Sequence, residues 1–405
     1  MSIHMLPLFI PAMFLVIFLE WRHDKAHGHQ HFKFESSVMN ICCGLIERVM
    51  DLYVFIGLFL WFEYLQSHVG FLTISPTNPF AWIALIFLVD FLIYWFHRGG
   101  HTINLLWGAH VTHHQCEEFN FTVAFRNSIF PHIFRGIILS VVAIIGFGGE
   151  MIIIALTING IWQFAIHTTK VDKMGILEGI IATPSSHRVH HACNDLYLDR
   201  NFGGMLMIWD KIFGTYQAEI EAPVYGLKNP IQTNNPLHAY THVWQDMIRA
   251  SWHVKRVKDL LKIWFGTPAG FYSRYKIEQP QAPAVTPRLS NQLLHYIIGQ
   301  IVMLTTLLLL TLMFEEFISP IFRMQNTVLL VVSSISVCLL MSPSKWTFRF
   351  ELLRLVCITG VALHCHALVG MWLVVLLPVS LIWFLWVWGK FNENENENKN
   401  LSKNQ

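Results

Sequence analysis

The spacing of histidines is the feature that most limits what this chain can fold into. Two histidines four residues apart are followed by two copies of the pattern His-x-x-His-His. Residues three or four apart on a helix lie on one face, so the members of each group can point into a common site. Imidazole binds Zn, Cu, Fe and Ni, and the spacing therefore predicts a metal centre built from separate parts of the chain. The groups are His97 and His101; His110, His113 and His114; and His187, His190 and His191.

Hydrophobic residues dominate the rest of the chain. They make up 54% of it, charged residues make up only 13%, and the mean hydropathy is +0.44. This composition predicts an all-α fold, a multi-pass transmembrane helical bundle. A net charge of +2 gives no basis for nucleic-acid binding. The first apolar run has no basic leader, so we expect a retained helix rather than a cleaved signal peptide. The predicted spans are Met5–Trp21, Cys43–Tyr64, Phe80–Phe96, Ile129–Phe147, Met151–Ala165, Leu293–Met313, Val328–Met341, Leu352–Leu368 and Val369–Trp388.

Changes in composition divide the chain into five predicted segments. Residues 1–79 are N-terminal transmembrane helices, 80–220 a catalytic domain, 221–290 an amphipathic and linker region, 291–390 C-terminal transmembrane helices, and 391–405 a disordered Asn-Glu tail. Within the third segment, the basic amphipathic stretch Val254–Trp264 is typical of a helix that lies on a membrane surface.

Charge in the loops predicts the orientation of the spans. The loop from Arg22 to Lys33 is basic and is expected in the cytoplasm, whereas the loop from Gln66 to Pro79 has no Lys or Arg and is expected outside. Counting spans from there returns every histidine group to the cytoplasmic face. The predicted metal site therefore lies where the helices leave the membrane on that side.

Four further residues are candidates for the site. His167 follows the Met151–Ala165 span and is predicted as a ligand, because that span returns to the histidine-bearing face. Asp90 precedes His97 by two helical turns; it either orients a ligand histidine or makes a local hydrogen bond within the bundle. Asn201 is a weaker candidate for supporting the ligands, and Glu118, or its neighbour Glu117, for a head-group contact or a proton path.

Three classes of function remain open from the residues alone. An iron oxygenase acting on a lipid fits best, because eight or nine nitrogen ligands exceed the needs of one ion and imply two metals. A metal transporter would place its ligands near the bilayer midplane, whereas these groups lie at the ends of spans. A zinc hydrolase needs fewer ligands and a carboxylate base, which Glu117 or Glu118 would provide.

The three groups and their flanks resemble the histidine boxes of the fatty acid hydroxylase superfamily, which includes the sterol desaturases. The boxes read HRGGH from His97, HVTHH from His110 and HRVHH from His187, and the third is followed by NFG at residues 201–203 and WDKIFGT at 209–215. The resemblance covers about Asp90 to Thr215. It implies a membrane-bound enzyme that uses O2 and two iron ions, held by the box histidines, to hydroxylate a lipid C–H bond.

Within the superfamily, the chain most resembles the alkylglycerol monooxygenases. The motifs WFHR, HHQCEEFNFTVAFRNS and WQFAIHT carry this resemblance. It implies ether-lipid cleavage with tetrahydrobiopterin as reductant and matches His167 to a further family histidine. Thr102 after the first box and Ser186 before the third depart from the pattern of that branch. A lipid desaturase, or a hydroxylase of sterols or carotenoids with another electron donor such as a redox protein, therefore stays open.

Overall fold

The computed structural model describes residues 6–231, 233–275, 289–363 and 378–392. Throughout these residues the regular structure is helical, and the β contacts are isolated bridges such as the one between Ala192 and Tyr225. The all-α prediction is confirmed for this part of the chain. The predicted tail, apart from residues 391 and 392, lies outside the described residues, as do residues 232 and 276–288 of the predicted amphipathic and linker region.

The chain divides into two compact units, and the division falls within α1 (Leu6–Ala26) after Phe14. The unit that carries the histidines comprises Leu15–Thr233 and Leu237–Gln281. Its further helices are α2 (Phe34–His68), α3 (Pro79–Thr102), α4 (Asn104–His110), α5 (Phe130–Ile145), α6 (Gly149–Ala165), α7 (Pro184–His191), α8 (Ile208–Ile212), α9 (Pro236–Ser251), α10 (Val257–Phe265) and α11 (Pro268–Tyr275). Short 3-10 helices are η2 (Val111–Gln115), η3 (Phe121–Phe125) and η4 (Gly175–Leu177).

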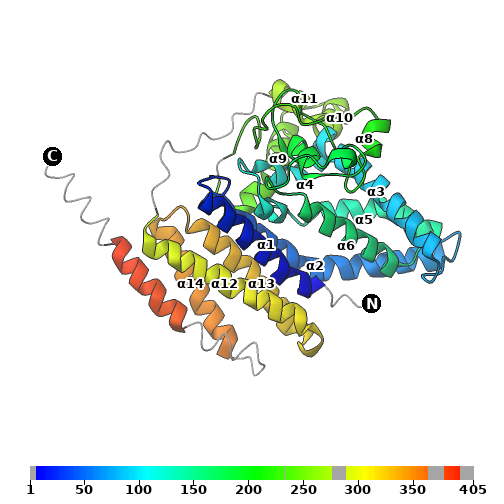
Figure 1. The fold of residues 1–405 in the computed structure, drawn as a ribbon. Helices are drawn as coiled ribbons and strands as arrows, with labels where there is room; N and C mark the ends of the chain where they lie inside the picture. Colours follow the sequence, from blue (N-terminus) through cyan, green and yellow to red (C-terminus); the bar gives the residue numbers. More distant parts are fainter. Residues whose placement is uncertain (1–5, 232, 276–288, 364–377, 393–405) are drawn as a thin grey trace. The chain divides into compact units, whose positions relative to one another are not determined.

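Four long helices of this unit, α2, α3, α5 and α6, pack into a bundle (Figure 1). Their facing side chains, among them Phe62, Leu85 and Leu139, are fully buried in one apolar core. The α5–α6 hairpin turns at Gly146, whose φ of 128° favours glycine and whose Cβ would lie 2.2 Å from the Leu72 carbonyl oxygen. The short helices α4 and α8 to α11 gather at one end of the bundle, at the top of Figure 1, where the histidine boxes also lie.

The second unit comprises Met1–Phe14, Asn234–Pro236 and Ala282–Gln405. Its helices α12 (Asn291–Met313), α13 (Pro320–Leu339) and α14 (Lys345–Leu363) pack in sequence order, with the 3-10 helix η5 (Glu315–Phe317) between the first two. A further helix covers residues 378–392. The predicted span Val369–Trp388 is described only from residue 378, and the end of Leu352–Leu368 lies outside the described residues.

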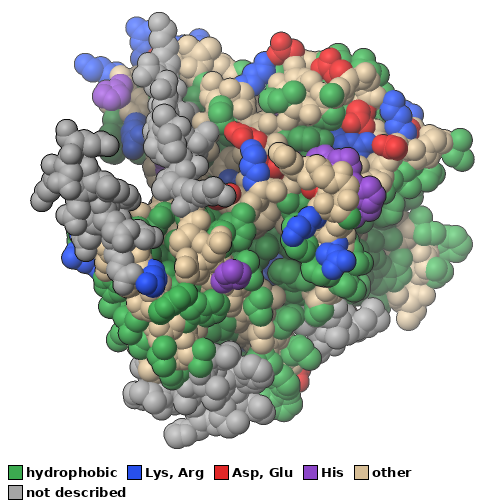
Figure 2. Space-filling view, turned by 60° about the vertical axis from the view of Figure 1, so that its left-hand side comes forward, with side chains coloured by type: hydrophobic (Ala, Val, Ile, Leu, Met, Phe, Trp, Pro, Cys, Tyr) green, Lys and Arg blue, Asp and Glu red, His purple; other side chains and the backbone are tan. Residues whose placement is uncertain are grey.

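Three of the described helices, α3, α12 and α13, are long and apolar enough to cross a membrane. The apolar helices α5 and α6 are shorter, and the predicted span Cys43–Tyr64 is part of the longer helix α2. On α3, Phe80 and Ile83 are 77% and 55% exposed, which suits contact with lipid rather than water. Hydrophobic side chains also cover much of the face in Figure 2, where Lys and Arg are scattered and form no continuous basic surface. These features indicate an integral membrane protein.

Candidate metal centre

Five segments bring the predicted histidines together. The last turns of α3 carry the first box, and Ile103, with extended backbone (φ −123°, ψ 119°), separates it from α4. The second box spans the end of α4 and η2, the third occupies α7, and His167 follows the end of α6. Thr183 begins α7 with a capping box: its side chain accepts from Ser186 N–H, and the Ser186 side chain accepts from Thr183 N–H. Ser186, one of the two departures from the family pattern, therefore helps to cap the helix that carries the third box.

The structure sorts the nine histidines into two clusters, within each of which the ligand atoms lie no more than 4.8 Å apart. The clusters are adjacent, because the rings of His113 and His114, one in each cluster, have centroids 5.5 Å apart. Each cluster contains residues from at least three of the five segments. The five-histidine cluster contains His97, His101, His110, His114 and His190, and the four-histidine cluster contains His113, His167, His187 and His191.

Backbone carbonyls fix which ring nitrogen of three histidines is free. The Nδ1 atom of His97 lies 2.9 Å from the Phe202 carbonyl oxygen, that of His190 lies 3.0 Å from Arg200 O, and that of His167 lies 2.6 Å from Gln163 O. A carbonyl accepts only, so each Nδ1 must carry the proton. A neutral imidazole then has its lone pair on Nε2, the tautomer in which histidine binds a metal through that atom.

The free nitrogens crowd one another in a way that suits a cation. Nε2 atoms pair at 2.9–3.2 Å, and those of His97 and His167, whose protons are on Nδ1, can only accept. Other buried ring nitrogens, His101 Nε2, His190 Nε2 and His113 Nδ1, have no hydrogen-bond partner at all. Unsatisfied buried acceptors cost about 1–3 kcal/mol each, and a shared metal ion removes that cost. The close pairs are His97–His110, His110–His114, His113–His167, His167–His187 and His187–His191.

Burial keeps these imidazoles neutral. It lowers the pKa of His167 to about 4. Burial, together with the neighbouring imidazoles, also lowers the pKa of His110, His113, His114, His187, His190 and His191 well below the usual value of 6.5. A metal ligand must be unprotonated, so the lone pairs needed for coordination are available at neutral pH. The donor set and its protonation state fit two metal ions.

The loop after α7 holds the carbonyls that orient His97 and His190. Asp210 accepts from Phe202 N–H at 2.8 Å and from Gly203 N–H at 2.7 Å, so it fixes the backbone whose carbonyl meets His97. Asn201 has a positive φ of 58°, which Asn tolerates better than most residues, and its side-chain amide donates to Ser186 O and Gln217 O. Asn201 thus ties this loop to α7 without a recorded contact to a ligand ring.

Asp90, on α3, accepts hydrogen bonds from the same loop. Its carboxylate accepts from Met205 N–H at 2.7 Å, Leu206 N–H at 3.2 Å and the Trp209 indole N–H at 2.9 Å. Asn159 donates to it as well, at 3.1 Å. Among the described residues its hydrogen-bond partners are therefore this loop and Asn159 of α6, and a role of Asp90 in orienting a ligand histidine stays a prediction.

Two charged contacts enclose the four-histidine cluster. Arg188, within the third box, binds Glu219 through two nitrogens at 2.9 and 2.7 Å and donates to the Val171 carbonyl at 2.8 Å. Glu118 forms an ion pair with Lys33 at 2.7 Å and accepts from the Cys116 thiol. The position of Glu118 in this ion pair offers no support for a role in head-group binding or proton transfer.

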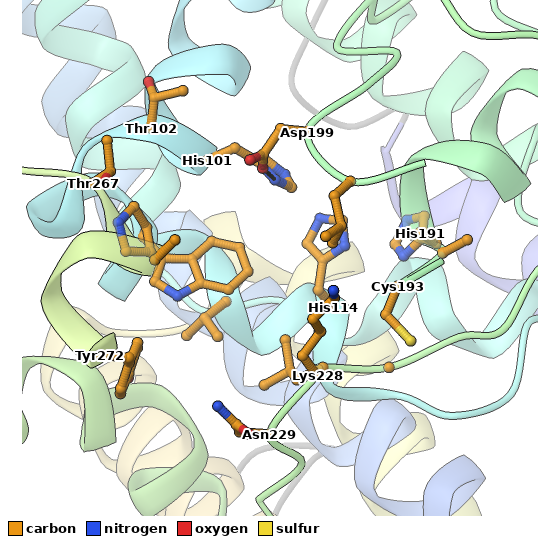
Figure 3. Close-up of a pocket in the computed structure, with 18 of the residues that line it drawn as sticks. His101, Thr102, His114, His191, Cys193, Asp199, Lys228, Asn229, Thr267 and Tyr272 are labelled. Carbon is orange, nitrogen blue, oxygen red and sulfur yellow. Dashed lines mark ion pairs between the residues drawn. The ribbon is translucent and has the colours of Figure 1, made fainter. Parts of the chain in front are cut away.

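A cavity of about 520 Å³ opens against the histidines. His101, His114 and His190 of the five-histidine cluster line it, together with His191 of the other cluster. Figure 3 shows the labelled histidines together, with Thr267 and Tyr272 across the cavity. Its remaining wall mixes apolar groups with polar ones: Thr102, Trp107, Val111, Leu198, Asp199, Leu227, Lys228, Asn229 and His242.

Sequence reasoning missed several residues of the centre. Phe119 packs on three rings of the four-histidine cluster, with a centroid distance of 5.2 Å to His191. Trp107 lies 5.3 Å from His101 in the other cluster. Both aromatic residues lie close to the boxes in sequence, which was an available signal. Lys228 and Tyr272, more than thirty residues beyond the last box, gave none.

Comparison with known proteins agrees with this geometry. Residues 82–215 match the family model "Fatty acid hydroxylase". The chain is 32% identical to human alkylglycerol monooxygenase over 273 residues, 67% of this chain and 57% of that protein. It is 28% identical to the zebrafish (Danio rerio) alkylglycerol monooxygenase over 374 residues, 88% of this chain and 81% of that one. Human lathosterol oxidase is 27% identical over 144 residues, 33% of this chain and 44% of its own.

No solved structure matches the chain. The family match begins in the first turn of α3, ends at Thr215 and includes all nine clustered histidines together with Asp90 and Asp210. The matched region is therefore the part of the fold that builds both clusters, and it is a fatty acid hydroxylase domain.

Proposed function

We propose that this protein is a membrane-bound diiron monooxygenase that hydroxylates a lipid C–H bond with O2. The observation that carries the proposal is the pair of clusters, in each of which buried imidazole nitrogens converge within 4.8 Å and some have no hydrogen-bond partner among the described residues. The five-histidine and four-histidine clusters would each hold one iron ion. Iron held there would supply the activation of O2, chemistry that no amino-acid side chain provides.

The cavity beside the clusters supports a lipid substrate whose reacting end enters it. Its volume of about 520 Å³ suits a head group with the first carbons of a chain. Trp107, Val111 and Leu227 exclude water around the reacting carbon, whereas Asn229 offers a donor to polar oxygens. Lys228, which is paired with Asp195, adds a cation to the same wall. An ether lipid of the alkylglycerol class fits this mixed lining, and the relatives named for that activity favour it.

The overall reaction needs a reductant. One oxygen atom of O2 enters the C–H bond and the other leaves as water, which consumes two electrons and two protons. A reduced pterin, or else a redox protein, would supply the electrons. For an alkylglycerol, hydroxylation of the carbon next to the ether oxygen gives a product that breaks into an aldehyde and a glycerol. We further propose that both clusters face the cytoplasm, where such reductants are found.

The alternatives of another class have less support. A transporter needs ligands along a path through the bilayer, and these clusters lie at one end of the α2–α3–α5–α6 bundle. A zinc hydrolase needs a carboxylate beside an open metal position, but Glu118 is occupied by Lys33. Desaturation, or hydroxylation of a sterol, remains a second candidate within the family, because lathosterol oxidase also matches.

The test uses the full-length protein in lipid nanodiscs. Metal analysis should find about two iron ions per chain, as two clusters of imidazoles require. An alkylglycerol, a reduced pterin and isotope-labelled dioxygen should give a fatty aldehyde, and one labelled oxygen atom should enter the product. Turnover without O2, or zinc in place of iron, would contradict the proposal. Parallel reactions with a sterol and a fatty acid then identify the substrate class.

A further inference from the structure

Helix α10 turns hydrophobic side chains away from the protein. Val257, Leu261 and Phe265 are spaced four residues apart, so they share a face, and they are 72%, 53% and 59% exposed. Ile263 is the residue through which α10 is buried. A surface helix in water usually shows the opposite arrangement, with its polar face outward. The exposed apolar face of α10 therefore needs a non-aqueous neighbour.

Cations flank this apolar face. Lys255, Arg256, Lys258 and Lys262 are all exposed, and none has an ion pair recorded within the described residues. The acidic residue of the helix, Asp259, is instead paired with Arg274 at 3.3 Å. Trp252, just before the helix, is 78% exposed. Exposed apolar and indole groups next to unpaired cations are the chemistry that an anionic phospholipid surface complements.

The helix is fastened to the candidate metal centre. The side-chain amide of Asn104 donates to Ile263 O at 2.8 Å, and its backbone N–H donates to Gly266 O at 2.9 Å. Asn104 is the first residue of α4, which follows the first box directly. The residues after α10, Thr267 to Ala269, line the cavity beside the clusters. Whatever holds the outer face of α10 therefore also sets the position of one cavity wall.

We propose that α10 lies in the surface of an anionic phospholipid bilayer, with Leu261 and Phe265 among the acyl chains and Lys258 and Lys262 at the phosphates. This contact keeps the Thr267–Ala269 wall of the cavity at the level of the lipid head groups. An integral membrane protein is always next to a bilayer. This proximity favours a phospholipid surface over a soluble protein as the partner of α10. The placement of α10 goes beyond the proposed function and does not depend on the chemistry of the cavity.

Spin labels measure this placement directly. Ser replaces Cys357, which is exposed, Cys193, which is half-buried, and Cys365, which lies outside the described residues. The full-length protein would then carry one label through Leu261→Cys, Phe265→Cys or Lys258→Cys. Nanodiscs are made with and without an anionic phospholipid. Collisions of each label with O2, which concentrates in acyl chains, are compared with collisions with a water-soluble nickel chelate. Lys258→Cys is the matched control on the same helix.

Labels at 261 and 265 should favour O2 and be shielded from nickel severalfold more than the label at 258, most strongly in anionic nanodiscs. Equal nickel access at all three positions would overturn the proposal. So would shielding that appears only when a soluble protein is added, which would assign the face to that partner. The collision measurement needs no turnover. If the labels are shielded as expected but the protein forms no hydroxylated lipid, only the proposed function is contradicted.

Discussion

Two regions of the molecule gather metal-binding side chains, and they differ in the partners that these side chains already have. Glu47, Asp51 and His132, on α2 and α5, are close enough together to hold an ion. However, Arg48 lies 3.1 Å from Glu47 and 2.9 Å from Asp51. His132 uses both ring nitrogens, one toward Glu47 at 2.7 Å and the other toward Arg135. The group is an ion-pair network, in which the carboxylates of Glu47 and Asp51 already face Arg48 and His132.

The two histidine clusters have no such compensation. Burial lowers the pKa of most of their rings, and their free nitrogens face each other or have no partner among the described residues. The difference shows that closeness of ligand residues does not by itself make a metal site. What matters is whether the ligand atoms already have partners. Where they do, a metal ion has to displace an existing ion pair and adds no net stabilisation. Four predictions test this contrast.

The largest effect is expected from His190→Ala or His113→Ala, one in each cluster. Each removes a ligand, so we expect product formation to fall below detection and bound iron to decrease. Activity assays and metal analysis of the purified protein measure this. His295→Ala, at an exposed position on α12, is the matched control and should change neither quantity. Full turnover by either cluster variant would end the ligand assignment.

The ion-pair network should respond in stability rather than in metal content. Glu47→Gln leaves buried positive charge without its partner, which typically costs about 3–5 kcal/mol. We expect a clear fall in the thermal unfolding midpoint in nanodiscs with unchanged iron per chain. Glu35→Gln, at an exposed position on the same helix, should have little effect on either. Loss of a bound metal ion from Glu47→Gln would mean that the network is a third metal site.

A smaller effect is expected where a ligand is only oriented. Asp210→Asn weakens the support of Phe202, whose carbonyl fixes the tautomer of His97. Removing such outer partners typically costs about 10–100-fold in metal affinity or activity. Iron titration of the apoprotein should show the loss as weaker binding with the fold retained. Asp172→Asn, at an exposed carboxylate, is the control; equal affinity in both variants would remove Asp210 from this role.

The smallest effect concerns a buried histidine outside both clusters. His242 lines the cavity, and burial lowers its pKa from 6.5 to about 4. Between these values the unfolded chain binds more protons than the folded one, so stability falls as the pH falls across this window. By about pH 5 the loss is about 2 kcal/mol at most. Unfolding midpoints of the iron-loaded protein should fall less with acid in His242→Gln; an unchanged pH profile would contradict this.

The sequence predicted most of what local spacing controls. The all-α fold and the long apolar helices follow from composition, and the boxes were recognisable because one helical turn separates their members. His167 could be predicted as a ligand because it follows a helix that returns to the face bearing the other histidines. The role of Asp90 was not decided by the sequence, because a carboxylate two turns from His97 can orient a ligand ring or make a hydrogen bond within the bundle. Its contacts with the loop at residues 205–209 appear only in the tertiary structure.

The amino-acid pattern alone therefore determined that nine imidazoles would be available near one end of a helical bundle, since helix periodicity depends on neighbours in the chain. Tertiary structure decided how they divide into five and four, because His190 and His191 belong to different clusters although they are adjacent in sequence. It also decided which carbonyls orient the rings and that Tyr272 and Lys228 share a cavity with them. These depend on contacts between distant segments, which no local pattern encodes.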